Sequence, residues 1–247
     1  MVSRPSPIRL DLLLVRRGLV SSRQRGQELI AEGMVLVDGL PVHKAARRVR
    51  PDQALSLRDP GPQWVGRGAQ KLLGALRAFE VDVEGMTCAD LGSSTGGFTE
   101  VLLHRGARRV YAIDVGRGQL AWKLRTDDRV VVMEGVNARH LDELPEPMDR
   151  IVGDLSFISL RLILPTVQRL LRPDGQAVLL VKPQFEVGRS GIGKGGRVRE
   201  EADREEAIDR VRGHAGEAGF RILAGADSTL AGAKAGNVEH FLHLEKT

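Results

Sequence analysis

Cysteine and aromatic residues are scarce in this sequence of 247 residues, and long apolar runs are absent. The single cysteine, Cys88, excludes an internal disulfide framework and a zinc site built from cysteines, and we expect no metal. Its apolar neighbours predict a buried strand position. No apolar run could span a membrane, and no early segment has the charged start, apolar stretch and cleavage site of a signal peptide. We therefore expect a soluble, cytoplasmic protein with no membrane contact.

The positive charge is confined to one part of the chain. The first 60 residues hold 11 Lys and Arg against 6 Asp and Glu, whereas the remainder holds 26 of each sign. The whole net charge of +5 therefore lies in the first quarter. A neutral body with a basic appendage predicts a polyanionic partner bound by that appendage. A basic, solvated face without a ligand is the alternative.

The first quarter has the pattern of a small α+β domain, for which we expect residues 1–58. Leucines at helical spacing predict a helix over residues 9–18, and Ser21 or Ser22 can cap a second helix that ends at Gly33. The Asp-Gly pair at 38–39 predicts a tight turn between two strands. We expect strands near residues 34–37, 41–43 and 54–57.

Basic side chains gather around these helices and the turn, where they could follow phosphates without reading sequence. The run RLDLLLVRRGLVSSRQRGQELIAEGMVLVDGLPVHK resembles the S4 domain, an RNA-binding module. This resemblance implies binding to structured RNA through the helix pair and the hairpin. The residues expected to contact RNA are Arg16, Arg17, Arg23, Arg25, Lys44, Arg47 and Arg48.

The turn-rich sequence DPGP at residues 59–62 predicts a domain boundary. We expect an interdomain linker over residues 59–66 and a second domain over residues 67–247. Trp64 follows the break at once, and it could pack the two domains together or couple them.

The second domain alternates strand-like and helix-like segments, which predicts an α/β fold with a mostly parallel sheet covered on both faces. The expected strands are residues 87–91, 109–113, 130–133, 150–154, 176–181, 220–226 and 238–244. The expected helices are residues 69–79, 98–105, 118–124, 160–171 and 201–218. Ligands of such sheets bind at the carboxyl ends of the strands.

A glycine-rich turn follows the first of these strands in the sequence ADLGSSTGGFTEVLL, and Asp114 ends the next strand, where it could bind a ribose diol. The turn matches G-x-G-x-x-G poorly, which disfavours a pyrophosphate ligand and favours S-adenosylmethionine, which has no phosphates. Asn137 could contact adenine or be an ordinary loop residue. The expected cofactor-binding residues are Asp90, Gly92, Ser93, Ser94, Thr95, Gly96, Gly97, Phe98, Asp114, Val115, Asn137 and Asp154.

Four separated polar residues, Lys71, Asp154, Lys182 and Glu239, form the expected catalytic set. Taken singly, they could be an exposed helix lysine, a helix cap, a solvated strand end and an edge-strand carboxylate. Together they match the Lys-Asp-Lys-Glu tetrad of FtsJ-like ribose 2′-O-methyltransferases. With the blocks DLSFISL, LVKPQFEVG and GNVEHF, residues 8–247 resemble the TlyA family of rRNA cytidine 2′-O-methyltransferases, some of which are named haemolysins.

This resemblance implies a Rossmann-like seven-stranded domain joined to an S4-like domain. It implies methyl transfer from S-adenosylmethionine to a ribose 2′-hydroxyl, of cytidine in 16S or 23S rRNA or both, with Lys182 orienting the hydroxyl or accepting its proton beside the cation of Lys71. The expected partners are rRNA and ribosomal subunits, and the expected state is a monomer or weak dimer. The alternatives are a non-catalytic ribosome- or RNA-binding factor and a haemolysin, although no membrane-active segment is visible.

Two further segments carry expectations of their own. Residues 188–199, GRSGIGKGGRVR, are rich in glycine and basic residues and could close on RNA phosphates, or could be a plain surface loop. Residues 200–212 are charged nearly throughout and predict a helix with a solvated face.

Overall fold

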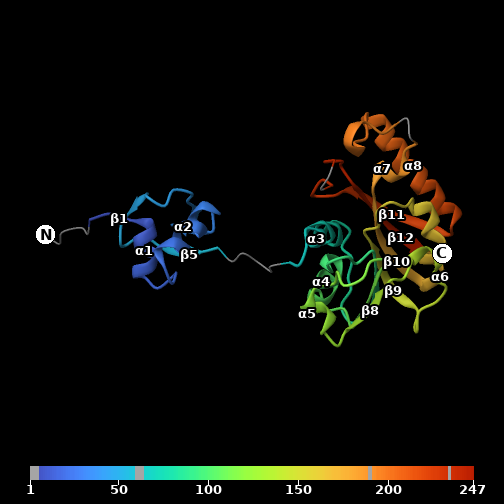
Figure 1. Ribbon diagram of the computed structural model, residues 1–247, viewed down its shortest axis with the longest axis horizontal. Coiled ribbons are helices and arrows are strands. Elements are labelled where there is room, and N and C mark those ends of the chain that lie inside the picture. The colour runs from blue at the N-terminus through green and yellow to red at the C-terminus, as the bar shows by residue number, and fades with distance from the viewer. Residues whose placement is uncertain (1–5, 59–63, 189–190, 233–234) are drawn as a thin grey trace. The chain divides into compact units, whose positions relative to one another are not determined.

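The computed structural model describes residues 6–58, 64–188, 191–232 and 235–247. The chain divides into two compact units, Met1–Gln63 and Trp64–Thr247 (Figure 1). The expected boundary at residues 59–62 lies outside the described residues. The end of the expected linker belongs to the second unit, because the Trp64 ring meets His104 edge-on at 5.3 Å and the Val65 amide donates to Glu100 Oε2 at 2.7 Å.

The small unit packs two helices against short strands. Ser22 caps the second helix by accepting a hydrogen bond from the Arg25 amide at 3.2 Å. Asp38 and Gly39 form the expected turn with φ of 50° and 80°. The elements are α1 (Leu10–Arg16), α2 (Arg23–Ala31), a sheet of β3 (Leu40–Pro41), β2 (Val35–Val37) and β5 (Leu55–Leu57), and the pair β1 (Ile8–Arg9) and β4 (Arg48–Val49).

In the large unit, the sheet order is β11-β12-β10-β9-β6-β7-β8. Only the pairs that involve β12 are antiparallel, so β12 is a reversed strand inside an otherwise parallel sheet. The mostly parallel seven-stranded sheet that the sequence predicts is therefore confirmed. Its strands are β6 (Thr87–Leu91), β7 (Arg109–Asp114), β8 (Val130–Glu134), β9 (Met148–Gly153), β10 (Leu171–Val181), β11 (Phe220–Asp227) and β12 (His240–Lys246).

Helices cover both faces of this sheet (Figure 1). Successive residues of β10 alternate between two apolar clusters, Val178 and Leu180 joining α3 and α4, and Leu179 and Val181 joining α6 and α8. Apolar side chains cover both faces of the sheet, which is why the strand sequences are continuous apolar runs. The helices are α3 (Gly68–Ala78), α4 (Gly97–His104), α5 (Trp122–Arg125), α6 (Leu164–Leu170), α7 (Pro183–Glu186) and α8 (Glu201–Glu217).

Several expected elements have different bounds in the structure, and β10 begins at Leu171, five residues before the expected start. The helix expected over 118–124 starts only at Trp122, because Gly118 has a left-handed φ of 70° that a helix cannot contain. The strand expected over 238–244 is displaced by two residues, so Glu239 precedes β12. The strand expected over 41–43 ends at Pro41, although the Val42 amide still donates to the Val35 carbonyl at 3.0 Å.

Burial and side-chain placement restrict the chemistry that this unit can perform. Burial raises the pKa of the Cys88 thiol to about 12, so the thiol stays protonated. Within the described ranges, no three His, Cys, Asp or Glu side chains are placed to hold a metal ion. The same residues contain no helix that is both long and apolar enough to cross a membrane.

Candidate active site

Pockets line the edge of the sheet where the parallel strands β6, β7, β9 and β10 end. Two of them share Gly92, Ser94, Asp154 and Ser156, and we call their union the cofactor groove. A third pocket, which we call the acceptor pocket, adjoins the cofactor groove, because both contain Asp154, Ser156 and Lys182. It is lined by Lys71, Asp154, Ser156, Phe157, Lys182, Gln184, Phe185, Gly195, Gly196, Gly232, Ala235, Asn237 and Glu239.

The first ion pair of the acceptor pocket joins the ends of two neighbouring strands. Lys182 follows β10 and Asp154 follows β9, and Lys182 Nζ lies 2.6 Å from Asp154 Oδ1. The same ammonium group donates to Ser156 Oγ at 2.8 Å. The Lys182 side chain is only 10% exposed. It is therefore a fixed, partly desolvated cation and not a solvated strand end.

The second ion pair connects distant parts of the sequence. Lys71 lies in the second turn of α3, and its Nζ donates to Glu239 Oε2 at 2.6 Å. Both side chains are nearly buried, with exposed fractions of 10% and 3%. Lys71 is therefore not an exposed helix lysine. Glu239 does not lie on a sheet edge either, because β12 runs between β10 and β11.

The structure thus brings the four expected catalytic residues to one pocket as two lysine–carboxylate pairs. In each pair the lysine nitrogen and the carboxylate oxygen are 2.6 Å apart. The arrangement offers cationic hydrogen-bond donors to an oxygen atom that enters the pocket.

The glycine-rich turn after β6 lets backbone come close to the end of β9. The Gly92 and Ser93 amides both donate to the Ile113 carbonyl, at 2.8 and 3.1 Å. A Cβ atom on Gly92 would lie 3.0 Å from the Asp154 carbonyl oxygen, and the φ of Gly92 is 84°. A side chain at this position would therefore collide with the backbone that follows β9. Of the turn, Gly92, Ser93, Ser94, Thr95, Gly97 and Phe98 line the groove.

The far end of the groove is formed by residues after β7 and β8. Asp114, Val115 and Asn137 all line it, as expected. Asp114 also shapes it, because its carboxylate accepts hydrogen bonds from the Ser94 amide at 2.8 Å and the Gly116 amide at 2.6 Å. Asn137 Oδ1 accepts from the Arg139 amide at 3.0 Å and caps the short helix Ala138–His140.

Two of the expected cofactor-binding residues, Asp90 and Gly96, do not line either part of the groove. Asp90 Oδ2 accepts from the amide and hydroxyl of Thr99, at 2.9 and 2.7 Å, and so fixes the start of α4. Burial raises the Asp90 pKa to about 7, opposed by these hydrogen bonds and reinforced by Asp154 and Asp114. Asp90 and Gly96 therefore support the glycine-rich turn without lining the cofactor groove.

Three residues of the site were missed by the sequence reasoning. Ser156 touches all parts of the site and accepts the Lys182 hydrogen bond. Gln119 lines the groove beside Ser94, whose hydroxyl donates to it at 3.3 Å. Phe157 is 82% exposed with a left-handed φ of 64°, and its ring lies 5.2 Å from that of Phe185. For Ser156 and Phe157 the available signal was their position two and three residues after Asp154, an expected catalytic residue.

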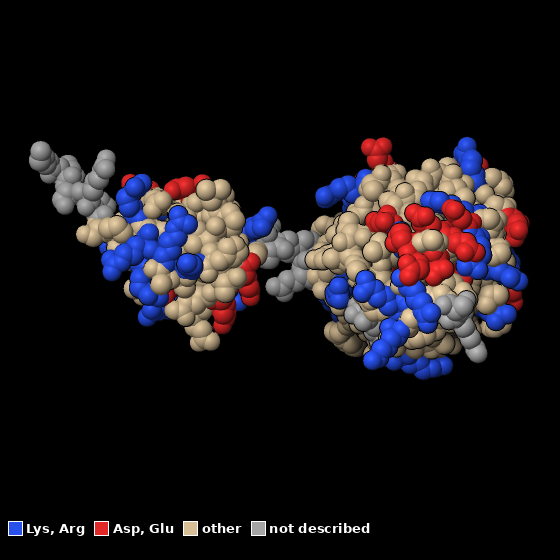
Figure 2. Space-filling model, turned by 90° about the horizontal axis from the view of Figure 1, so that it is seen from above, with Lys and Arg blue, Asp and Glu red and all other residues tan. Residues whose placement is uncertain are grey.

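In the small unit, the expected RNA-binding cations differ in their surroundings. Within the described ranges, Arg16, Lys44 and Arg47 are exposed and have no carboxylate partner. Arg23 pairs with buried Asp11 at 3.0 Å, and Arg25 with Glu28 at 3.1 Å. Arg17 and Arg48 donate to the backbone carbonyls of Pro51 and Pro7. Basic side chains dominate one visible face of this unit (Figure 2).

Comparison with known proteins gives the same division of the chain. The FtsJ-like methyltransferase family model matches residues 64–246, and the S4 domain model matches residues 8–55. The 16S/23S rRNA (cytidine-2′-O)-methyltransferase TlyA of Mycobacterium tuberculosis is 50% identical over 96% of this chain and 89% of its own length. Hemolysin A of Brachyspira hyodysenteriae is 37% identical, over 96% of this chain and 99% of its own.

A solved structure agrees in fold over almost the whole chain. A hemolysin candidate from Streptococcus thermophilus is 40% identical, with a TM-score of 0.74, and the match covers 99% of this chain and 90% of that one. The family expected from the sequence motifs is therefore confirmed. The chain belongs to the TlyA family, whose members join an S4 domain to an FtsJ-like methyltransferase domain.

Proposed function

We propose that this protein transfers a methyl group from S-adenosylmethionine to the 2′-hydroxyl of a cytidine in 16S or 23S rRNA, or in both. The observation that carries the proposal is the pair of buried lysine–carboxylate contacts in one pocket that adjoins a glycine-lined groove. The M. tuberculosis relative, half of whose aligned residues are identical, is named for this reaction.

The cofactor groove suits S-adenosylmethionine in shape and charge. We assign the amino-acid part of the cofactor to the end of the groove that Gly92, Ser93, Thr95 and Phe98 line. Asp114 offers carboxylate oxygens to a ribose diol, and Val136 and Ile163 give an apolar surface for adenine. When bound, the cofactor supplies an electrophilic methyl group on a positively charged sulfur.

Lys182 is the residue we assign to the acceptor hydroxyl. Asp154 and Ser156 fix its ammonium group at the junction of groove and pocket, where it can orient the 2′-oxygen for in-line attack. As the neutral amine, Lys182 accepts the hydroxyl proton while the new C–O bond forms.

Phe157 gives the pocket a surface for a nucleobase. Its ring is exposed beside the acceptor pocket and is oriented by Phe185. Unpaired RNA bases stack on aromatic side chains of this kind, and an enzyme acting on a nucleotide in structured RNA gains from holding that nucleotide out of the helix. This feature supports RNA, and not a small molecule, as the methyl acceptor.

The test is methylation of rRNA by the purified protein with Lys182 replaced. We expect Lys182→Ala to lower turnover by about 100-fold or more, the usual scale for loss of a proton-transfer group. Cofactor affinity, measured by calorimetry, should stay within about threefold of the parent, because binding depends mainly on the glycine-rich turn and Asp114.

Lys182→Arg is the matched control, because arginine keeps the positive charge beside Asp154 but cannot accept a proton. We expect it to be nearly as inactive as Lys182→Ala. Near-normal turnover of Lys182→Arg would restrict Lys182 to orienting the hydroxyl. If the parent protein itself methylates no rRNA while binding it, the chain is a non-catalytic RNA-binding factor.

A further inference from the structure

The basic segment after α7 is an ordered hairpin in its described part, residues 191–199. Ile192 and Val198 form an antiparallel bridge. The Gly193 amide donates to the Arg197 carbonyl at 2.7 Å, and the Arg199 amide donates to the Gly191 carbonyl at 3.1 Å. We call residues 191–199 the basic hairpin.

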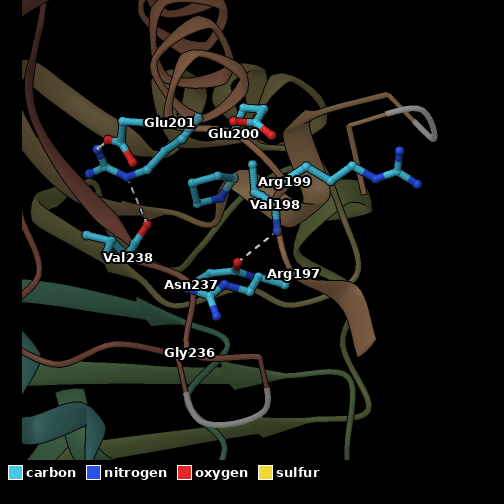
Figure 3. Close-up of a pocket in the computed structure, with 10 residues that line it drawn as sticks. Arg197, Val198, Arg199, Glu200, Glu201, Gly236, Asn237 and Val238 are labelled. Carbon is cyan, nitrogen blue, oxygen red and sulfur yellow. Dashed lines mark hydrogen bonds and ion pairs between the residues drawn. The ribbon is translucent and has the colours of Figure 1, made fainter. Parts of the chain in front are cut away.

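Asn237 fastens the basic hairpin to the chain that leads into β12. Its Oδ1 accepts from the Val198 amide at 3.0 Å, and its Nδ2 donates to the Gly196 carbonyl at 3.0 Å. Figure 3 shows the first of these contacts at the base of a pocket lined by Arg197, Arg199 and Val238. Asn237 is only 6% exposed, and both the oxygen and the nitrogen of its side-chain amide form hydrogen bonds with the basic hairpin.

This fastening links the hairpin to the catalytic residues over a short length of chain. Glu239, which holds Lys71, is two residues beyond Asn237. Gly195 and Gly196 at the hairpin turn line the acceptor pocket itself, as does Asn237. The position of the hairpin is therefore tied to the position of the Lys71–Glu239 pair.

The cations of the hairpin are available to a ligand. Lys194, Arg197 and Arg199 are exposed, and none has a carboxylate partner or side-chain hydrogen bond within the described ranges. Arg204, which lines one pocket with Arg197 and Arg199, is not available in this way, because it donates to Glu201, Asp227 and the Val238 carbonyl. Three unpaired cations beside a catalytic pocket are suited to a phosphodiester backbone.

The surroundings limit where such a backbone can lie. The helix that follows the hairpin, α8, has exposed acidic side chains in its first half, among them Glu201, Glu205 and Glu206. Acidic side chains gather on the face of the large unit seen in Figure 2, with basic side chains beside them. The acidic face repels phosphates and leaves the hairpin side as the favourable path.

We propose that the basic hairpin binds the RNA backbone next to the nucleotide in the acceptor pocket, and that Asn237 is the positioning residue that holds it in register with the catalytic pairs. This inference rests on the proposed function and adds a second RNA-contacting surface, on the catalytic unit. Lys194, Arg197 and Arg199 contact phosphates without reading sequence, and Asn237 acts only through the hairpin.

The first test is the double variant Arg197→Ala/Arg199→Ala, with Arg210→Ala as control, since Arg210 is an exposed cation of α8 that lies outside the hairpin and pairs with Glu206. We expect the double variant to raise KM for rRNA about tenfold or more, with kcat and cofactor affinity within about twofold. The slope of log affinity against log salt should become shallower by about 1 to 2, as expected for two lost phosphate contacts. Arg210→Ala should change none of these.

The second test is Asn237→Ala in the parent and in the double variant. If Asn237 acts through the hairpin, it raises KM for rRNA in the parent and adds little in the double variant. Equal effects in both backgrounds, or a fall in kcat at constant KM, would overturn the positioning role. If Asn237→Ala does not fold, the arginine variants alone decide the proposal, because their side chains are exposed.

The outcomes separate this proposal from the proposed function. A parent protein that binds rRNA but never methylates it refutes the function, and the affinity measurements still report on the hairpin. A parent that methylates rRNA while the arginine variants match it refutes the hairpin proposal alone. Loss of binding to ribosomal subunits with unchanged binding to naked rRNA would assign the hairpin to a protein partner and overturn its role on RNA.

Discussion

At the scale of single residues, the two buried ion pairs determine where the site is sensitive to substitution. Lys71 and Glu239 are nearly buried and contact each other at 2.6 Å. A buried ion pair adds little net stability relative to apolar residues of the same volume, because desolvation offsets its attraction. Removing one partner is costly, because the other charge is then buried without compensation. We therefore expect the pair to serve chemistry, which requires the charges, more than stability.

We expect Glu239→Leu to lower the free energy of unfolding by about 3 kcal/mol or more, because Lys71 is left unpaired. The joint variant Lys71→Met/Glu239→Leu should recover most of this loss and still transfer no methyl group. Urea unfolding and a methylation assay measure the two effects. A joint variant no more stable than Glu239→Leu would show that the pair stabilises the fold.

Asp90 gives the fold a pH dependence of known sign. Its folded-state pKa of about 7 lies above the unfolded value of about 4, so the folded protein keeps a proton that the unfolded chain releases between these pH values. The stability contributed by protonated Asp90 is present below about pH 4 and is lost as pH rises through about 7. We expect Asp90→Asn, which has no proton to lose, to gain stability relative to the parent over this range.

Chemical unfolding of both proteins at pH 5 and pH 8 measures this difference. The gain should grow by up to about 1.4 kcal/mol per pH unit and level off above pH 7. Thr99→Val, which removes the hydroxyl bond to Asp90 but not the carboxyl group, is the control that should keep the pH dependence. Parallel stability profiles for Asp90→Asn and the parent would contradict the raised pKa.

At the scale of elements, the junction between the glycine-rich turn and α5 depends on one position. Gly96 has a left-handed φ of 98°, and a Cβ atom there would lie 2.2 Å from Leu124 Cδ1. We expect Gly96→Ala to destabilise the protein by about 2 kcal/mol, from overpacking and backbone strain together. Adding Leu124→Ala should relieve the overpacking but not the strain. Thermal unfolding checks both, and additive losses would contradict the contact.

The sequence was most informative where a pattern repeats along one element. The apolar runs of β6 to β10 predicted a buried parallel sheet, and the four polar residues of the site were found individually. Their pairing was not predicted. Glu239 reaches Lys71 because β12 runs in reverse between β10 and β11, and no local sequence signal reveals that placement. The pair of two-residue strands β1 and β4 was missed for the same reason, since it joins distant residues.

At the scale of the whole molecule, charge is divided between binding and chemistry. The small unit presents Arg16, Lys44 and Arg47 without carboxylate partners within its described part, whereas the catalytic lysines of the large unit are neutralised in pairs. Affinity for RNA should therefore be salt-dependent through the small unit and the basic hairpin, and turnover of bound RNA should not be.

We expect Arg16→Ala/Lys44→Ala/Arg47→Ala to make the slope of log affinity for rRNA against log salt shallower by about 2 to 3. Turnover at saturating rRNA should change by less than about twofold. Arg50→Ala is the control, because Asp52 already neutralises Arg50 at 3.2 Å. A triple variant with an unchanged slope would remove these three residues from the RNA contact.

The reversed strand β12 has a consequence for the biosynthesis of the protein. Glu239 and Asn237 arrive at the site from the last strand-forming part of this sequence, after every other catalytic residue has been translated. A growing chain can form the small unit and most of the parallel sheet while its acceptor pocket is still open on the Lys71 side. We therefore expect the acceptor pocket to be completed only when this part of the chain has been made.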